Sequence, residues 1–204
     1  MAKIALIGSS GNAGSRILKE LVDRGHLVTA IARNPEKIAT LSGVVAVRGD
    51  VADRDALTNL LKGHDAVISS VHFTDSDPDT LIEAVRTSGV KRYLVVGGAG
   101  SLEIAPGVTL VSTPDFPAIY KTEATKGGVF LGKLRSVIDL DWTFLSPSAM
   151  FVPGKRTGTF RLGKDALLTA GDGSSTISFE DYAVALVDEI EPPKHVKQRF
   201  TVGY

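Results

Sequence analysis

The chain alternates short apolar runs with amphipathic helical patterns, and no other feature of the sequence constrains its fold as strongly. The apolar runs predict strands over residues 3–7, 27–32, 44–47, 66–69, 93–96, 142–145 and 199–202. The amphipathic patterns predict helices over residues 13–24, 53–61, 78–88, 120–137 and 179–190. Because the strand runs are apolar throughout, helices are expected on both faces of a parallel sheet. We therefore predict an α/β fold with a doubly wound parallel sheet of strand order 3-2-1-4-5-6.

Length and composition limit the chain to a few classes of protein. Its 204 residues are 43% hydrophobic, which suits one domain with an ordinary core. Lys and Arg together number 23, as do Asp and Glu, so no net charge draws the chain toward nucleic acid or an anionic membrane. The absence of cysteine excludes disulfides and thiolate metal sites, and it fits a reducing cytosol.

The ends and loops of the chain complete this outline. We recognise neither a signal peptide nor an apolar stretch of about 20 residues, and we expect a cytoplasmic protein with no membrane partner. Residues 1–204 are expected to form a single domain, in which residues 147–204 partly form a cap on the substrate side. Residues 97–117 hold four glycines and three prolines, and they predict a long loop without helix or strand. Both a monomer and a homodimer fit the sequence.

Three glycines, Gly8, Gly11 and Gly14, lie between the first expected strand and the first expected helix. A strand, a glycine turn and a helix N-terminus direct backbone N–H groups and a positive dipole at an anion. In this interpretation Gly8 permits the tight turn, Gly11 lets the backbone approach a pyrophosphate, and Gly14 lets the helix pack against the strand. The spacing differs from the standard G-x-G-x-x-G, so the position in a strand–turn–helix unit carries the assignment. We therefore expect a Rossmann-like dinucleotide site.

The end of the second strand indicates which dinucleotide binds. Nineteen residues after Gly14, where an NAD enzyme presents Asp or Glu to the ribose hydroxyls, this chain has Arg33, and Lys37 follows it. A planar guanidinium suits a phosphate on the ribose 2′ oxygen. The alternative is that both residues are solvated surface cations. The position favours NADP(H) over NAD(H).

The ends of the third and fourth strands supply further candidates. Asp50 follows the third strand, where it either accepts from the adenine amine or caps the helix that begins at residue 53. Ser69, Ser70 and Val71 end the fourth strand, where small residues let the backbone lie near the nicotinamide ribose.

Taken together, these motifs resemble those of the atypical short-chain dehydrogenases/reductases. More specifically, the chain is similar to the bacterial NADH-flavin reductase family, with biliverdin reductase B-like and NmrA-like relatives. The resemblance covers nearly the whole chain and rests on residues 8–14, 33, 49–51, 65–68, 97–102, 141–147, 161–163 and 199–204. It implies NADP(H) binding and a flavin as substrate. The cofactor contacts expected from motif and position are Gly8, Ser10, Gly11, Asn12, Ala13, Gly14, Arg33, Lys37, Asp50, Val51, Ser69, Ser70, Val71, Gly97, Gly98, Ser146 and Pro147.

The chemistry expected at this site is simple. Ordinary members of the superfamily use a Tyr-x-x-x-Lys pair to move a proton, but no tyrosine of this chain has a lysine four positions later. A flavin or quinone ring accepts hydride directly, and its proton can come from water. Ser101 lies near the position of the superfamily's catalytic serine and either bonds the acceptor or caps its own loop. We expect a flat aromatic acceptor to contact Phe116, Tyr120, Met150 and Phe151, although each of these also suits a core.

We therefore expect an NADPH-dependent oxidoreductase that transfers hydride directly to a flavin-like or quinone-like acceptor. The alternative is a non-catalytic NADP(H)-binding redox sensor or regulator of the NmrA-like type, since the missing Tyr-Lys pair fits both. An isomerase that uses bound NADP is disfavoured without the tyrosine. No metal site is expected, because His72 is the one histidine at a carboxyl end of a strand and has no partner.

Overall fold

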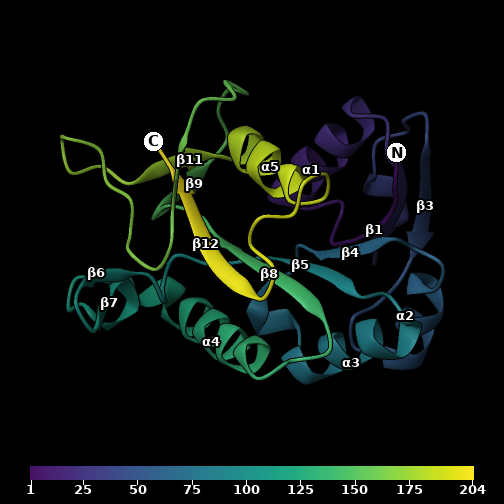
Figure 1. Ribbon diagram of the computed structural model, residues 1–204, viewed down its shortest axis with the longest axis horizontal. Helices are drawn as coiled ribbons and strands as arrows, with labels where there is room; N and C mark the ends of the chain where they lie inside the picture. The colour runs from purple at the N-terminus through teal and green to yellow at the C-terminus, as the bar shows by residue number, and fades with distance from the viewer.

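A twisted eight-stranded sheet crosses the molecule between two layers of helices (Figure 1). The computed structural model describes residues 1–204. The strand order is β10-β12-β8-β5-β4-β1-β2-β3, and every neighbouring pair is parallel except β10 and β12. The strands are β1 (Lys3–Ile7), β2 (Leu27–Ala32), β3 (Val44–Arg48), β4 (Ala66–Ser69), β5 (Arg92–Val96), β8 (Asp141–Ser146), β10 (Arg161–Gly163) and β12 (Gln198–Gly203).

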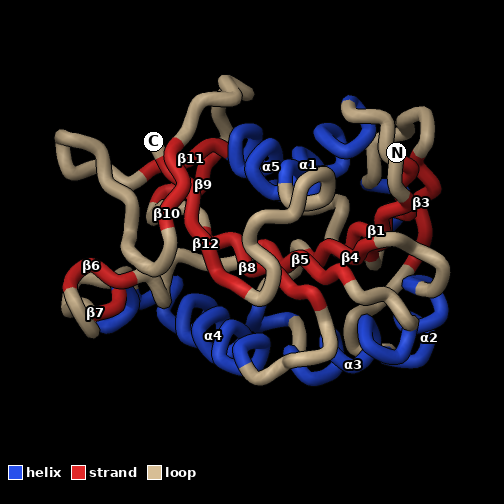
Figure 2. The backbone as a smooth tube through the Cα atoms, in the orientation of Figure 1, coloured by secondary structure: helices blue, strands red, loops and turns tan.

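The helices divide between the two faces of the sheet (Figure 2). Helices α1 and α5 cover one face, while α2, α3 and α4 cover the other. The α-helices are α1 (Asn12–Asp23), α2 (Arg54–Leu61), α3 (Pro78–Ser88), α4 (Ala118–Arg135) and α5 (Phe179–Asp188). The chain also has three short 3₁₀ helices, η1 (Pro35–Lys37), η2 (Phe73–Asp75) and η3 (Leu110–Ser112).

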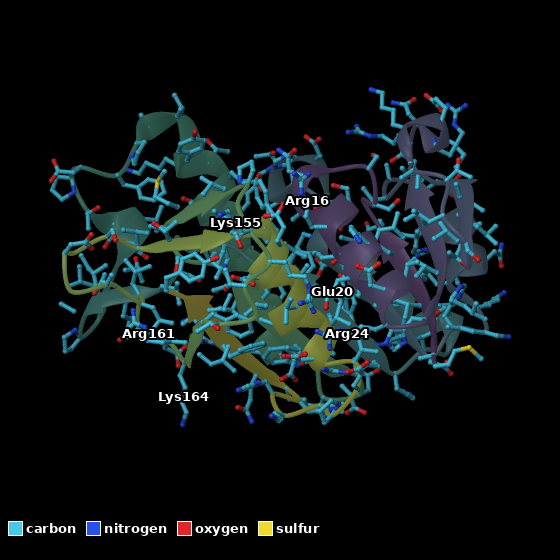
Figure 3. The ribbon with its side chains drawn as sticks, turned by 90° about the horizontal axis from the view of Figure 1, so that it is seen from above. Arg16, Glu20, Arg24, Lys155, Arg161 and Lys164 are labelled. Carbon is cyan, nitrogen blue, oxygen red and sulfur yellow. The ribbon has the colours of Figure 1, made fainter.

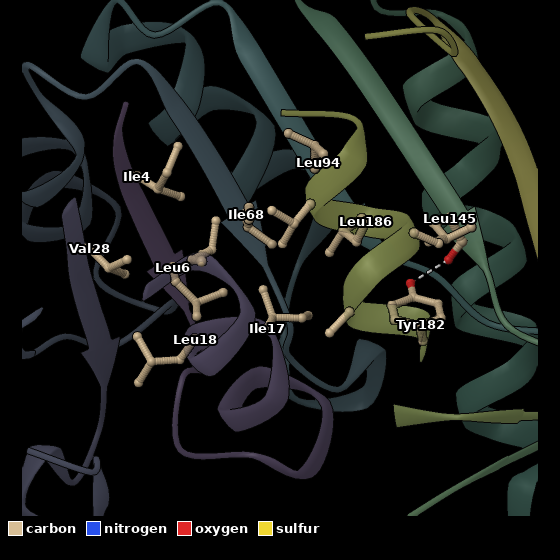
Figure 4. Close-up of a cluster of buried hydrophobic side chains, with 14 of the residues drawn as sticks. Ile4, Leu6, Ile17, Leu18, Val28, Ile68, Leu94, Leu145, Tyr182 and Leu186 are labelled. Atoms are coloured by element: carbon tan, nitrogen blue, oxygen red, sulfur yellow. Dashed lines mark hydrogen bonds between the residues drawn. The ribbon is translucent and has the colours of Figure 1, made fainter. Parts of the chain in front are cut away.

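Each face of the sheet buries its own hydrophobic cluster. Alternate residues of β1 point to opposite faces, so Ile4 and Leu6 join the cluster under α1 and α5, whereas Ala5 and Ile7 join the cluster under α2 to α4. Figure 4 shows the first cluster, in which the hydroxyl of Tyr182 also donates a hydrogen bond to the carbonyl of Leu145. Burial on both faces explains why the strand runs are apolar throughout.

The structure confirms the predicted sheet, since β3-β2-β1-β4-β5-β8 reproduces the order 3-2-1-4-5-6. The expected last strand, β12, extends the sheet beyond β8, and β10 adds an antiparallel edge. The predicted helices are observed with their ends shifted by at most two residues, and Gly25 follows α1 with φ +78°. No helix of the structure has both the length and the apolar character needed to cross a membrane.

The prediction that residues 97–117 lack regular structure was wrong. They contain the antiparallel hairpin of β6 (Glu103–Ala105) and β7 (Val108–Thr109), followed by η3. Gly107 has φ +74° in the turn between the strands, a conformation that suits glycine. Strands of three and two residues are too short to show a periodic pattern in a sequence. A second small sheet, of β9 (Met150–Val152) and β11 (Thr176–Ser178), was also unexpected.

Candidate functional site

Two glycines at the junction of β1 and α1 leave no room for a side chain. Gly8 has φ +80°, and a Cβ built on it would lie 2.0 Å from the carbonyl oxygen of Ser70. A Cβ on Gly14 would lie 2.1 Å from the carbonyl oxygen of Gly8, and one on Gly11 would lie 3.3 Å from the same atom. The glycines therefore bring the first turn of α1 close to the ends of β1 and β4. This close packing is the arrangement that the sequence predicted for Gly8 and Gly14.

The N-terminus of α1 presents backbone donors at this place. The N–H groups of Gly8 and Ser9 donate to the carbonyl of Ile31, whereas those of Asn12 and Ala13 meet no backbone acceptor. No side chain caps α1 at Gly11, and its first turn has no acidic residue. Unpaired N–H groups and the helix dipole together suit a phosphate. The residues present therefore fit the pyrophosphate of a dinucleotide.

Cations lie beside the glycine loop at the end of β2. Arg33 follows this strand, its side chain is 70% exposed, and its guanidinium lies 3.6 Å from the carboxylate of Asp75. Lys37 ends η1 and lines the same cavity as Arg33. Arg48, at the end of β3, lines a smaller hollow of about 390 Å³ next to Arg33 and Asp50. Arg48 was not among the predicted residues, although its place at the carboxyl end of a strand could have indicated it.

The ends of β3 and β4 supply polar groups to the same place. The carboxylate of Asp50 accepts a hydrogen bond from the backbone N–H of Ala52 at 3.0 Å, and Asp53 rather than Asp50 caps α2. Asp50 lines the cavity together with Ser70 and Val71. The carboxylate therefore makes a local turn and still faces the cavity.

A cavity of about 960 Å³ runs along the carboxyl ends of the strands. This is near the upper end of the range for small-molecule sites. Most of the predicted site residues line it, namely Gly8, Ser10, Gly11, Asn12, Ala13, Arg33, Lys37, Asp50, Val51, Ser70, Val71, Gly97, Gly98, Phe116, Tyr120, Pro147, Met150 and Phe151.

Four of the predicted residues do not line this cavity. Gly14 faces the backbone of Gly8, as its packing role requires. Ser69 is buried, and its hydroxyl is 2.9 Å from the hydroxyl of Tyr93. The other two are Ser101 and Ser146.

Ser101 and Ser146 both contact a buried arginine of β12. The guanidinium of Arg199, whose side chain is 3% exposed, donates to the hydroxyls of Ser101 and Ser146 at 3.3 and 3.5 Å. The same guanidinium donates to the carboxylate of Asp165. Arg199 therefore fixes both serines behind the cavity wall, and the catalytic role of Ser101 stays a prediction.

Aromatic side chains line the cavity beside β9 and α5. Phe151 on β9 packs against Phe179 and Tyr182 of α5, with ring centroids 4.5 and 4.6 Å apart. Tyr120 and Met150 are 60% and 57% exposed, so they offer apolar surface that the fold itself does not bury. A flat apolar molecule would find adaptable walls here.

Two further residues that line the cavity could not be predicted. Phe73, on η2, stacks on the buried ring of Phe144 and also lines the cavity. The carboxylate of Glu123, on α4, accepts from the backbone N–H groups of Phe73 and Thr74, both at 2.8 Å. Glu123 therefore holds η2 against α4 across 50 residues of sequence, a contact that no local pattern indicates.

The side chains available for proton transfer are few. Burial raises the pKa of Tyr93 and of Tyr182 above the ordinary range, and both hydroxyls are bonded inside the core. Tyr120 is the one tyrosine that lines the cavity. No group of three or more His, Asp or Glu side chains lies close enough together to ligate a metal ion.

Comparison with known proteins agrees with this geometry. The model of a family described as NAD(P)H-binding matches residues 8–193. The Bacillus subtilis (strain 168) protein YwnB is 42% identical over 98% of this chain and 97% of its own length. A candidate epimerase from Bacteroides thetaiotaomicron has a crystal structure with a TM-score of 0.95 and 44% identity, covering 99% of this chain and 96% of its own.

Two other solved structures are similar to this chain. A candidate NADH-flavin reductase from Streptococcus pneumoniae TIGR4 has a TM-score of 0.83 and 37% identity, covering 100% of this chain and 99% of its own. A Veillonella parvula short-chain dehydrogenase/reductase in complex with NADP shares the fold at 15% identity, with a TM-score of 0.79. The chain described here belongs to the NAD(P)H-binding family, in the superfamily of atypical short-chain dehydrogenases/reductases and NmrA-like proteins.

Proposed function

We propose that the protein is an NADPH-dependent reductase of planar, flavin-like or quinone-like acceptors. One observation carries this proposal, namely that a single cavity joins the glycine loop and its cations to the aromatic wall. A dinucleotide at the first end and a flat acceptor at the second would then share one space. When bound, NADPH supplies the hydride for such a reaction.

The nucleotide end would be held by the groups already described. The N–H groups of Asn12 and Ala13 suit the pyrophosphate, because they point out of a helix N-terminus with no other acceptor. Arg33 and Lys37 suit a 2′-phosphate, and Asp50 suits the adenine amine. Gly97 and Pro147 would lie along the nicotinamide, at the ends of β5 and β8.

The acceptor end would position a ring rather than donate a proton to it. The wall at residues 147–151, with Phe179, comes from the segment that we propose as the substrate-side cap within a single domain of residues 1–204. No Tyr-Lys pair faces the cavity, so a carbonyl substrate would lack its usual proton donor. A flavin or quinone needs no such donor, because hydride adds to its conjugated ring and water supplies the proton. The name of the Streptococcus pneumoniae relative supports the same acceptor class.

The test is a panel of acceptors mixed with the protein and NADPH, followed by the loss of nicotinamide absorbance. FMN, riboflavin and a quinone cover the acceptor class, and a ketone serves as the carbonyl control. We expect oxidation of NADPH with at least one flavin or quinone and none with the ketone. Tight binding of NADPH without any turnover would contradict the proposal and favour the redox sensor of the NmrA-like type.

A further inference from the structure

Two cationic side chains and four carboxylates line the cavity. Arg33 and Lys37 are its only Arg or Lys side chains, and both lie after β2. Asp50 and Asp75 lie beside these cations. Asp115 precedes Phe116 of the aromatic wall, and Glu123 lies one helical turn beyond Tyr120. Figure 1 places α4 under the part of the sheet that lies away from β3. The carboxylates of the cavity therefore outnumber its cations, and the expected 2′-phosphate would occupy both cations.

The negative charge at the acceptor end is only partly balanced. Glu123 accepts two backbone N–H groups, and its carboxylate lies 3.4 Å from the ring of His72. Asp115 is exposed, and no ion pair involves it. The nearby Lys126 donates to the carbonyl of Thr74 at 3.5 Å, outside the cavity wall. No fixed cation of this end is thus available to receive an anionic group of an acceptor.

From this charge distribution we infer that the acceptor site selects planar acceptors without a phosphate group, such as uncharged flavins and quinones, over phosphorylated flavins. The inference rests on the proposed reductase function. A flavin phosphate carries almost two negative charges at neutral pH, and each nearby carboxylate repels it. An uncharged side chain on the same ring meets the apolar wall without this cost.

Three flavins with the same ring and different side chains test the inference. Lumiflavin and riboflavin are uncharged, whereas FMN carries the phosphate. With saturating NADPH, we expect kcat/KM for riboflavin to exceed that for FMN about five- to tenfold at low salt. The ratio falls as salt is added, because exposed charges are screened. Lumiflavin is expected to behave as riboflavin does.

Two variants assign the preference to the acceptor end. Asp115→Asn removes one repelling charge, so the riboflavin-to-FMN ratio falls about two- to threefold. Asp55→Asn, on α2 outside the cavity and 82% exposed, removes the same charge elsewhere and leaves the ratio as it was. An equal fall in both variants would show that overall charge, rather than Asp115, sets the preference, and an unchanged ratio in Asp115→Asn would show that Asp115 has no part in it; either result overturns the inference.

The remaining outcomes separate the inference from the proposed function. Equal use of riboflavin and FMN, or a preference for FMN, overturns the inference and leaves the reductase in place. If no flavin is reduced while NADPH binds, the reductase proposal fails. The inference is then decided by quenching of flavin fluorescence in the presence of NADP⁺, where tighter riboflavin binding supports it and equal binding overturns it.

Discussion

Arg33 is held in position by a single exposed ion pair. Its guanidinium lies 3.6 Å from Asp75, and the two side chains are 70% and 51% exposed. Such a pair stabilises the fold little, because water and salt screen both charges. A 2′-phosphate would offer Arg33 a planar, doubly charged partner in place of one carboxylate. Asp75 is therefore a competitor for the group that we propose to recognise NADP(H).

Arg33→Ala is expected to weaken NADP(H) binding about tenfold, because one charge-assisted contact to the 2′-phosphate is lost. NAD(H) lacks this phosphate, so its affinity is expected to change little. Titration of both coenzymes into both proteins measures the difference. Asp75→Asn is the matched variant, and it is expected to tighten NADP(H) a few-fold by releasing Arg33. Equal affinity for the two coenzymes in the unaltered protein would make Arg33 an ordinary surface cation.

Whether a residue of the site could be predicted depends on how far along the chain its partners lie. Gly8 and Gly14 were predictable because their role depends on the strand and helix that flank them directly. Glu123 was not predictable, because its partners at residues 73 and 74 come from another element. Ser101 was predicted to contact the acceptor, but its side chain does not line the cavity and accepts from Arg199, which is 98 residues away. Local spacing cannot predict such a contact.

At the scale of elements, buried carboxylates of α1 and α5 bind the segment 153–160 and hold it against both helices. Glu20 of α1, 3% exposed, accepts two hydrogen bonds from Arg156 and another from Arg24. Figure 3 shows Arg16, Glu20 and Arg24 in a row along α1. The hydrogen bond from Arg156 is the main reason that the pKa of Glu20 is held below its usual value, against its burial.

Asp181 makes the second attachment of the segment. It is fully buried at the start of α5 and accepts from the backbone N–H groups of Thr157 and Gly158 and from the hydroxyl of Tyr204. Burial alone would raise the pKa of Asp181, but these hydrogen bonds outweigh it and lower the pKa. The sequence does not predict these contacts of Asp181, because a loop partner 23 residues away leaves no local signal.

Asp181→Asn is expected to destabilise the protein by about 2–3 kcal/mol, the range for hydrogen bonds to a charged group. At about 2–4 °C per kcal/mol, the melting temperature falls by about 4–12 °C. Thermal melts between pH 3 and pH 7 measure this effect and its pH dependence. Because the folded pKa is lowered, the charge stabilises the fold fully above the unfolded pKa of about 3.9, and the stabilisation is lost as the pH falls through the folded value.

The difference between wild type and Asp181→Asn should therefore shrink at acid pH. Asp55→Asn controls for the loss of a charge, since Asp55 is exposed and bonds only its neighbour Arg54. An equal loss of stability in both variants, or a difference that does not change between pH 7 and pH 3, would show that the carboxylate of Asp181 does not fasten the segment.

Across the whole molecule, the cavity lies where elements of both hydrophobic layers end. Ile7 and Phe73 belong to the cluster under α2 to α4, and they line the cavity together with Phe151, which packs on the cluster under α1 and α5. The order of the parallel strands was predictable, because each crossover is local and right-handed. The small sheet of β9 and β11 was not, because its strands pair across 26 residues and show no pattern of their own.

A ligand that spans this cavity is expected to stabilise both layers as one unit. At 100 times its Kd, NADPH adds about 2.7 kcal/mol to the free energy of unfolding. For a chain of this size, the melting temperature rises by about 5–11 °C in a single transition. NADH at the same concentration, if it binds 30-fold more weakly, adds only about 0.9 kcal/mol, or about 2–4 °C. Scanning calorimetry with each coenzyme measures both shifts.

Arg33→Ala makes this measurement specific to the proposed binding mode. The variant should keep the melting temperature of the unliganded protein, since its exposed ion pair contributes little to stability. Its shift with NADPH should fall toward the shift with NADH, because only the 2′-phosphate contact has been removed. Equal melting-temperature shifts with NADPH in the variant and the unaltered protein would show that Arg33 does not contact the 2′-phosphate. In that case Arg48, in the adjoining hollow, becomes the residue to change next.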